Sequence, residues 1–348
     1  YSKYESMGEV KKRVVFTTHT PEEAGNEQHD FDLLSKMSFF NGITDSEIRK
    51  ILNENGNRLN YTLSALRFAK IANGVSEMHG EVSREMWSGF EGICEITSIT
   101  NSQNKKYWKD DILEEAFEAN DDKTLLARKK EMKKALFKIV ADQSGKLFDD
   151  NVLTLVWARR FAGYKRADLI TADAKRFEKL LKNADFPIQI IWAGKPYPED
   201  YSAIDTFNSL FWKTLPHPNI AVLTGYELGL SAMLKKGSDV WLNNPRLYRE
   251  ASGTSGMTAA MNGSVNFSIP DGWIPEFAVH GQNSFIIEPA DRKIPQHEQD
   301  IIECDRLLEI LEKEILPTYY TKPKTWAKIM KNGMKDVSPA FESCRMAK

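Results

Sequence analysis

From Asn151 onward the chain alternates short apolar runs with helical stretches, and this alternation constrains the fold more than any other feature. Strands that alternate with helices are typical of a parallel sheet flanked by helices, so this part is predicted to be a Rossmann-like α/β unit. The apolar runs, several of them rich in Val and Ile, are the predicted strands Leu153–Ala158, Ile188–Trp192, Ile220–Leu223, Asp239–Leu242 and Val265–Ile269. Predicted helices between and after them are Lys165–Lys182, Leu228–Lys236, Gly256–Asn262, Asp300–Ile315 and Trp326–Met334.

The first part of the chain contains one clear strand candidate, Val14–Thr18, and several helices. Residues 59–87 are expected to be mostly helical, with Asn60 as the N-cap. Two more helices are predicted at 109–119 and 122–142, and the many Lys and Arg side chains of the second are expected to form a solvated surface. One strand followed mainly by helices is half of a Rossmann-like unit. The N-terminal domain is therefore expected to be incomplete, within a longer polypeptide.

The length of 348 residues indicates two domains, since a typical domain has about 150 residues. The polar, Gly-containing turn Gly145–Asp150 is the predicted boundary, because the texture of the sequence changes there. This boundary gives a first domain at 1–148 and a second domain at 149–322, followed by a C-terminal helical segment at 323–348.

Composition excludes several classes of protein. The 47 Lys and Arg residues nearly balance the 49 Asp and Glu residues, which predicts no nucleic-acid or membrane partner. Three cysteines without CxxC spacing exclude a disulfide framework or a zinc ribbon and favour a reduced, cytoplasmic protein without a metal. The sequence has no HExxH, GxSxG or Walker A motif, so metalloprotease, serine hydrolase and P-loop interpretations have no support.

The loop after the first predicted strand of the second half carries four cations within eight residues, in the stretch RRFAGYKR. Open α/β sheets bind ligands beyond the carboxyl ends of their strands, where such cations can hold a phosphate or diphosphate. We favour a functional role for Arg160 and Lys165. Arg159 and Arg166 are at least as well explained as solvated residues or partners of local carboxylates.

A second candidate site is the run of small residues from Glu250 to Gly263, EASGTSGMTAAMNG. Small residues let backbone N–H groups approach a phosphate or a polyhydroxyl ligand closely, and Glu250 is suited to accept hydrogen bonds from sugar hydroxyls. The alternative is a tight turn that packs a helix on the sheet. His19, at the end of the first strand, and Asn73, close to His79, are ambiguous by themselves because a lone histidine is more often structural.

Taken together and in order, five motifs resemble the α-glucan (glycogen) phosphorylases, in particular the bacterial branch of that family. They are VVFTTHTPEEAGN, ANGVSEMHGEVSREMW, VWARRFAGYKR, WAGKPYP and NPRLYREASGTSGMTAAMNGSVNFSIPDGW, and they span about residues 13–290. The resemblance implies two Rossmann-like domains of the GT-B glycosyltransferase architecture, with the active site in the cleft between them. It also implies that the N-terminal domain lacks its beginning and that the segment 323–348 packs back on it.

The resemblance assigns roles to particular residues. His19 matches the histidine beside the bound glucose, and Asn73 matches an asparagine that contacts a glucose hydroxyl. Arg160 and Lys165 match the arginine and lysine that hold the substrate phosphate and the cofactor phosphate. The loop that binds glucose hydroxyls and approaches phosphate corresponds to Glu250, Ser252, Gly253 and Thr254, and Tyr226 aligns with a cofactor-pocket tyrosine.

One position departs from the family pattern. Thr258 stands where these phosphorylases have the lysine that forms a Schiff base with pyridoxal phosphate. Threonine has no amine, so we expect no covalent attachment of the cofactor in this chain. In the family the cofactor acts through its phosphate group, and the imine serves only as a tether.

The sequence leaves three functions open. The first is retaining phosphorolysis of glycogen or maltodextrin by inorganic phosphate, which yields glucose 1-phosphate. The second is glucosyl transfer from a nucleotide sugar, as in glucan synthases, which share the Arg-x4-Lys spacing of Arg160 and Lys165 and need no pyridoxal phosphate. The third is a catalytically degenerate glucan-binding domain. A homodimer is possible for any of them.

Overall fold

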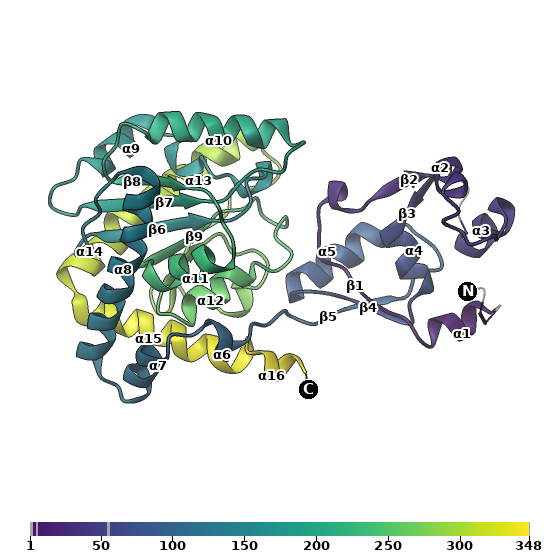
Figure 1. Ribbon diagram of the computed structural model, residues 1–348, viewed down its shortest axis with the longest axis horizontal. Coiled ribbons are helices and arrows are strands. Elements are labelled where there is room, and N and C mark those ends of the chain that lie inside the picture. Colours follow the sequence, from purple (N-terminus) through teal and green to yellow (C-terminus); the bar gives the residue numbers. More distant parts are fainter. Residues whose placement is uncertain (1–2, 5, 54–55, 348) are drawn as a thin grey trace. The chain divides into compact units, whose positions relative to one another are not determined.

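The computed structural model describes residues 3–4, 6–53 and 56–347, which form two compact units (Figure 1). The first unit comprises Tyr1–Asn101 and Tyr248–Ser252, and the second comprises Ser102–Leu247 and Gly253–Lys348. The division before Ser102 differs from the expected boundary at Gly145–Asp150. The helices between residues 102 and 145 pack within the second unit. The sequence did not reveal this, because the many charged residues at 122–142 indicated a solvent-exposed helix.

A three-stranded parallel sheet organises the first unit, in the order β1 (Val15–Thr17), β4 (Ile71–Gly74) and β5 (Glu95–Ser98). One face of this sheet, formed by the paired residues Phe16, Ala72 and Ile96, packs in an apolar cluster with Leu66 and Trp87. The remaining elements are α1 (Met7–Lys11), η1 (Glu23–Gly25), β2 (Gln28–Asp30), α2 (Phe31–Lys36), α3 (Asp45–Leu52), β3 (Arg58–Asn60), α4 (Tyr61–Phe68) and α5 (Glu77–Trp87).

Residues 59–87 are mostly helical, as predicted, but strand β4 interrupts them. The expected N-cap is confirmed, because the Asn60 side chain accepts a hydrogen bond from the Leu63 N–H at 2.9 Å. Strand β4 was missed because Ile71 and Ala72 are its only apolar residues, too short a run to break a helical pattern. It forms because β1 and β5 pair with it on both sides, which is a tertiary effect.

The second unit contains a six-stranded sheet in the order β11-β10-β9-β6-β7-β8, with all strands parallel. The five predicted strands of the second half are all present, and the short β11 was not predicted. The chain runs from β6 outward to β8 and then returns to β9, so the strand order reverses between β6 and β9. The strands are β6 (Leu153–Ala158), β7 (Ile188–Ala193), β8 (Ile220–Leu223), β9 (Val240–Asn243), β10 (Val265–Ser268) and β11 (Ser284–Ile286).

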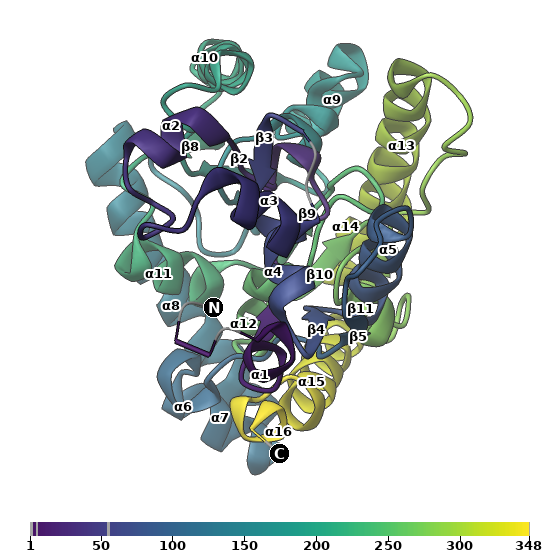
Figure 2. The same cartoon turned by 90° about the vertical axis from the view of Figure 1, so that its right-hand side faces the viewer.

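Helices cover both faces of this sheet (Figures 1 and 2). Along β6, Val156 and Ala158 face α8, α11 and α12, while Leu155 and Trp157 face the layer that includes α9, α10 and α13. Such apolar residues on both faces explain the continuous apolar runs of the strands. The helices are α6 (Lys105–Trp108), α7 (Asp111–Glu118), α8 (Asp122–Ser144), α9 (Ala174–Leu181), α10 (Tyr201–Thr214), α11 (Leu228–Gly237), α12 (Thr254–Ala260), α13 (Gln296–Ile310), α14 (Leu316–Thr321), α15 (Pro323–Ala340) and α16 (Ser343–Met346), with short turns at η2 (Gly163–Lys165), η3 (Leu169–Thr171) and η4 (Ile274–Glu276) and a π-helical turn at η5 (Leu311–Ile315).

The helix predicted at 165–182 is wrong over its first half. Only α9 and the two turns η2 and η3 form there, because Arg166 adopts a left-handed backbone conformation with φ of 48°. The buried side chain of Arg166 holds this conformation through hydrogen bonds to the carbonyls of Asn244 and Pro245, at 3.1 and 2.8 Å. Helix α10 was not predicted.

The expected solvated surface of α8 does not include all of its cations. Lys129 and Lys133 are only 4% and 2% exposed. The Lys129 ammonium donates hydrogen bonds to the carbonyls of Lys236, Ser238 and Asn262, at 2.7, 2.8 and 3.0 Å. Lys133 forms an ion pair with Asp239 at 2.6 Å. These two lysines fix α8 to the amino end of the sheet.

The C-terminal helix α15 packs within the second unit, against α12 and β10. Its Met330 and Met334 lie in the main apolar core with Leu113 of α7. Lys331 extends this contact with an ion pair to Asp122 at 2.6 Å. Helix α15 therefore covers residues that the sequence assigned to the first domain and that the structure assigns to the second unit.

Candidate functional site

Side-chain hydrogen bonds connect the carboxyl ends of β6, β9 and β10, where the strand order of the second unit reverses. The buried Arg159 guanidinium donates a hydrogen bond to the side-chain oxygen of Asn243. The Asn243 amide in turn donates to the hydroxyl of Ser268 at 3.1 Å. Arg159 therefore has a structural role. Ligands of open α/β sheets bind beside such a reversal, which makes this end of the sheet the candidate site.

Arg166, at the other end of the cationic stretch, is also fully engaged. It is 4% exposed and forms ion pairs with Asp300 at 2.8 Å and Glu303 at 2.6 Å. A buried arginine with two carboxylate partners balances its own charge and is not available to a ligand. The structure thus gives Arg166 the role of joining the β6 loop to α13.

Arg160 differs from both of these arginines. Its side chain is exposed and forms no hydrogen bond or ion pair with any residue that the structure describes. The next residue, Phe161, is buried and its N–H donates to the carbonyl of Lys195 at 3.1 Å, which fixes the backbone beside Arg160. Lys165 is half-buried, with its ammonium 5.2 Å from the centroid of the Tyr164 ring. A fixed backbone and a free guanidinium suit Arg160 to bind an anion.

Gly194 brings the loop after β7 close to Arg160. It has φ of 147°, and a Cβ atom there would lie 2.0 Å from the carbonyl oxygen of Arg159. Only glycine permits this approach. The exposed Lys195 consequently lies on a loop directly paired with that of Arg160.

Tyr226 lies under the carboxyl end of β6. Its hydroxyl donates to the carbonyl of Ala158 at 3.2 Å and accepts from the hydroxyl of Ser231 at 3.3 Å. Burial raises the pKa of Tyr226, so its phenol is neutral near pH 7. This hydroxyl has a structural use in the second unit.

Gly253, Thr254 and Thr258 form the start and body of α12. Gly253 is the N-cap with a left-handed φ of 84°, and Thr254 begins the helix. Thr258 is completely buried, and its hydroxyl donates to the carbonyl of Ser255 at 3.0 Å. The Thr258 side chain is therefore short, buried and already hydrogen-bonded.

Lys235 and Lys236, which precede α12 in the chain, both have contacts outside the candidate site. The Lys235 ammonium is 4% exposed and lies 3.8 Å from the centroid of the Trp108 ring, against the amino-end side of the sheet. Burial lowers the pKa of Lys235 to about 8. Lys236 lies 3.8 Å from the carboxylate of Asp110. These residues do not fit covalently attached pyridoxal phosphate.

In the first unit, His19 follows strand β1, and Asn73 lies near the carboxyl end of the adjacent parallel strand β4. The Thr18 N–H donates to the carbonyl of Asn73 at 3.0 Å, and the Thr17 hydroxyl donates to the Asn73 side-chain oxygen at 2.9 Å. These bonds place His19 and Asn73 at the same end of the sheet. His19 is exposed there, and Asn73 is half-buried.

Glu250 and Ser252 belong to the first unit although they precede α12 in the chain. The Ser76 hydroxyl, at the start of α5, donates to the carbonyl of Ala251 at 2.7 Å. The structure thus groups His19, Asn73, Glu250 and Ser252 in the first unit. The other sequence candidates, Arg160, Lys165, Tyr226, Gly253, Thr254 and Thr258, lie in the second unit.

His79 has a structural role. It is 1% exposed, and its Nδ1 accepts a hydrogen bond from the Val75 N–H at 3.1 Å. Burial lowers the pKa of His79 to about 4, so the ring is neutral at pH 7 and carries its proton on Nε2. Sequence reasoning did not single out Ser76. A serine three residues before His79, at the start of a helix, is the signal that could have revealed it.

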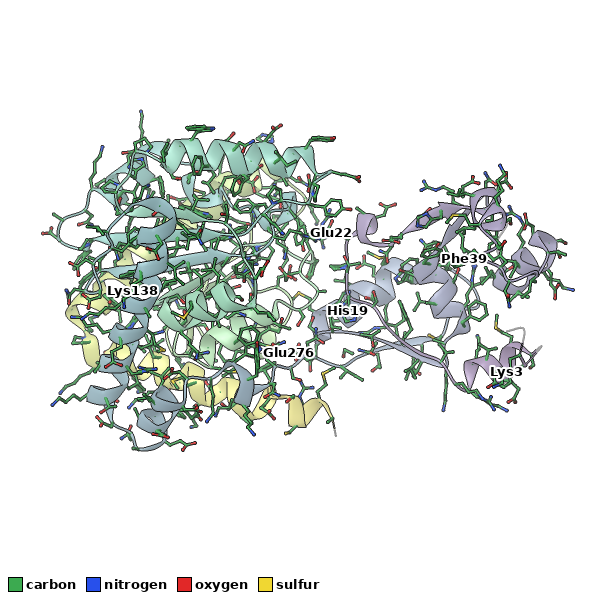
Figure 3. The ribbon with its side chains drawn as sticks, viewed as in Figure 1. Lys3, His19, Glu22, Phe39, Lys138 and Glu276 are labelled. Carbon is green, nitrogen blue, oxygen red and sulfur yellow. The ribbon has the colours of Figure 1, made fainter. Side chains whose placement is uncertain are left out.

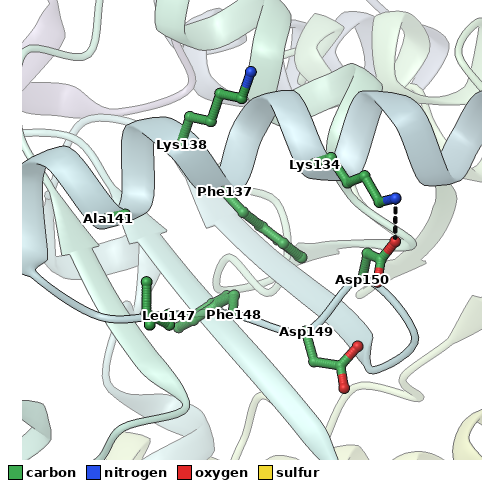
Figure 4. Close-up of a pocket in the computed structure, with 8 residues that line it drawn as sticks. All are labelled: Lys134, Phe137, Lys138, Ala141, Leu147, Phe148, Asp149 and Asp150. Carbon is green, nitrogen blue, oxygen red and sulfur yellow. Dashed lines mark ion pairs between the residues drawn. The ribbon is translucent and has the colours of Figure 1, made fainter.

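A hollow of about 550 Å³ lies elsewhere in the second unit (Figure 4). Its lining includes Phe137 and Lys138 of α8 together with Leu147, Phe148 and Asp150 of the following turn. This turn precedes β6, so the hollow is at the amino end of the sheet, opposite the loops of the candidate site. Because of this position, we do not assign the hollow to the candidate site, despite its size.

Neither a metal-binding cluster nor a membrane-spanning helix occurs in the described part of the chain. No group of three or more His, Cys, Asp and Glu side chains there is arranged to hold a metal ion. None of the helices in the described residues combines the length and the apolar composition needed to cross a bilayer.

The two units thus define a mixed α/β protein with parallel sheets, which fits a Rossmann-like glycosyltransferase fold, and comparisons with known proteins agree. The chain is 30% identical to the maltodextrin phosphorylase of Thermococcus litoralis, over 99% of this chain and 46% of that protein. It is 31% identical to the glycogen phosphorylase of Aquifex aeolicus, over 99% of this chain and 57% of that protein. It is also 45% identical to the protein of Methanocaldococcus jannaschii named Uncharacterized protein MJ1631, over 97% of this chain and 63% of that protein.

These similarities support a relationship to the phosphorylase family. The chain spans 46–63% of the length of these three relatives. No family model matches the sequence.

Proposed function

We propose that this chain is part of an α-glucan phosphorylase-like glycosyltransferase of the GT-B architecture, acting on glycogen or maltodextrin. The observation that carries the proposal is Arg160. The side chains of Arg159 and Arg166 form hydrogen bonds and ion pairs within the protein. Arg160 is exposed and has no such partner among the described residues. A free guanidinium beside the reversal of strand order is suited to hold a phosphate.

The proposed reaction is retaining phosphorolysis. An oxygen of inorganic phosphate bonds to C1 of the terminal glucosyl unit, and the bond from C1 to the glycosidic oxygen breaks. The proton that the phosphate carried passes to that oxygen as the shortened glucan departs, and glucose 1-phosphate is released. Arg160 and Lys165 would neutralise phosphate charge. The glucosyl unit would be held by Glu250, Ser252, Gly253 and Thr254, with His19 and Asn73 beside it.

We propose further that the first unit is a partial N-terminal domain. Parallel sheets are normally covered on both faces, because their connections place helices there. In this sheet the paired residues Val15 and Ile71 turn away from the apolar cluster and are 74% and 36% exposed. The other paired residues of this face, which include Thr17, Asn73 and Glu95, are polar. Two exposed apolar side chains at its edge are what a missing part of the domain would leave.

A second candidate function is glucosyl transfer from a nucleotide sugar. Thr258 favours it, since a threonine has no amine to attach pyridoxal phosphate and its buried hydroxyl is used within α12. In this case Arg160 and Lys165 would hold the diphosphate of the donor. Phosphorolysis remains the first candidate because the named relatives are phosphorylases.

The test is a pair of assays on the purified full chain. Release of glucose 1-phosphate from maltodextrin and inorganic phosphate, with loss of that activity in Arg160→Ala, supports phosphorolysis. Transfer of glucose from a nucleotide sugar to maltodextrin, in the absence of phosphorolysis, selects the second function. Binding of maltodextrin without either reaction would identify a degenerate glucan-binding domain.

A further inference from the structure

We infer that Glu250 is positioned by two contacts that anchor the segment Tyr248–Ser252, and that Glu22, Ser76 and Arg249 are positioning residues for the glucosyl site. This inference rests on the proposed function for the role of Glu250. The contacts themselves lie entirely within the first unit. We refer to residues 248–252 as the anchored segment.

The two contacts flank Glu250 in the chain. On one side, the Arg249 guanidinium donates to the carboxylate of Glu22 at 2.7 Å. On the other side, the carbonyl of Ala251 accepts from the Ser76 hydroxyl, also at 2.7 Å. With the residue before it and the residue after it both attached, the backbone of Glu250 has little freedom to move.

The Ser76 hydroxyl has two functions at once. It accepts a hydrogen bond from the His79 N–H at 3.0 Å, as the N-cap of α5, and it donates to Ala251. Ser76 and Ala251 are 0% and 8% exposed, so this bond is protected from water. A buried hydrogen bond is costly to leave unmade, which makes Ser76 the stronger of the two anchors.

The Glu22 contact connects the anchored segment to the loop that begins at His19. Figure 3 labels both His19 and Glu22 in the first unit. This loop has its own internal bonds. The Glu22 N–H donates to the Thr20 hydroxyl at 3.0 Å, and the Asn26 side chain donates to the Glu22 carbonyl at 3.0 Å. Glu250 and His19 are both expected to contact the glucosyl unit. The Arg249–Glu22 contact connects the two segments of the chain that carry them.

The Arg249–Glu22 pair is the weaker anchor because it is partly exposed. The Arg249 side chain is 44% exposed and that of Glu22 is 20% exposed. Ion pairs in such surroundings contribute little to overall stability. Their effect should therefore appear in the local order of the anchored segment and in the use of substrate, with little change in the melting temperature.

The experiment compares Glu22→Gln and Ser76→Ala with the unmodified full chain. Hydrogen exchange followed by mass spectrometry reports on the amides of residues 248–252, and maltodextrin phosphorolysis gives kcat and KM. We expect faster exchange in the segment for both variants. We also expect kcat/KM to fall two- to five-fold for Glu22→Gln and ten-fold or more for Ser76→Ala.

Glu9→Gln is the matched control, because Glu9 forms ion pairs with Lys12 and Arg13 in the same unit, away from the segment. The double exchange Glu22→Arg with Arg249→Glu should restore part of the lost kcat/KM, which a general loss of folding would not allow. If the amides of residues 248–252 exchange at the same rate in both single variants as in the unmodified chain, the inference is overturned. If the unmodified chain has neither phosphorolysis nor nucleotide-sugar transfer, the proposed function fails, and the exchange result alone decides the anchoring.

Discussion

Replacing Lys129 by Met should remove the contribution of this lysine to the rise of stability with pH between pH 7 and 9. Burial lowers the pKa of Lys129 to about 7, although three carbonyls accept its hydrogens. In the unfolded chain its pKa is about 10.4. Between these values the unfolded state binds more protons than the folded state, so the free energy of unfolding rises with pH and reaches its plateau above the unfolded pKa.

The size of this effect follows from linkage. With one proton taken up on unfolding, each pH unit contributes about 1.4 kcal/mol. Allowing for half-titration of the folded state at pH 7, the rise from pH 7 to 9 is about 2 kcal/mol. Below pH 6 both states are protonated, and Lys129 adds no further slope.

Urea denaturation at pH 6, 7, 8 and 9 measures this quantity. The difference in unfolding free energy between the unmodified chain and Lys129→Met should grow by about 2 kcal/mol from pH 7 to 9. Lys130→Met, which alters a half-exposed neighbour, should leave the slope unchanged. A difference that stays constant across this range would show that Lys129 remains charged in the folded state and would refute the reasoning.

Three further predictions concern the candidate site. Arg160→Ala should lower kcat/KM for phosphorolysis ten-fold or more, since a hydrogen bond to a charged group contributes about 1.5–3 kcal/mol; thermal unfolding should be unchanged, and a lower melting temperature with normal specific activity would indicate a structural role. Gly194→Ala should lower the free energy of unfolding by more than about 1 kcal/mol in urea, because its Cβ would lie 2.0 Å from a carbonyl oxygen; unchanged stability would show that the loop relaxes freely. Borohydride reduction with pyridoxal phosphate should trap no pyridoxyl group on the unmodified chain but should label Thr258→Lys, and a label on a native lysine would contradict the absence of a covalent cofactor.

Much of the fold of the second unit could be predicted from the sequence. The five apolar runs became strands, because strands buried on both faces of a parallel sheet are predominantly apolar. Glycines and short polar runs between them marked the loops in which Arg160 and Gly194 lie. These features depend on neighbours in the chain and on local composition, which a sequence displays directly.

Other features depended on residues distant in the chain. Strand β4 forms because β1 and β5 pair with it, and the Ile71 region alone is too short to indicate this. Helix α8 exposes some lysines and buries others. Lys129 is buried because carbonyls about a hundred residues later receive its hydrogens.

The candidate site shows the same division. The sequence by itself determined that a cluster of cations follows a strand and that Thr258 carries no amine. It could not determine which cations are free, because Arg159, Arg160 and Arg166 are alike as residues. Only the tertiary structure decided this, by placing Asn243 and the carboxylates of α13 against Arg159 and Arg166 and leaving Arg160 exposed. The physical reason is that a side chain's availability depends on which partners lie within hydrogen-bonding distance, and folding brings those partners from elsewhere in the chain.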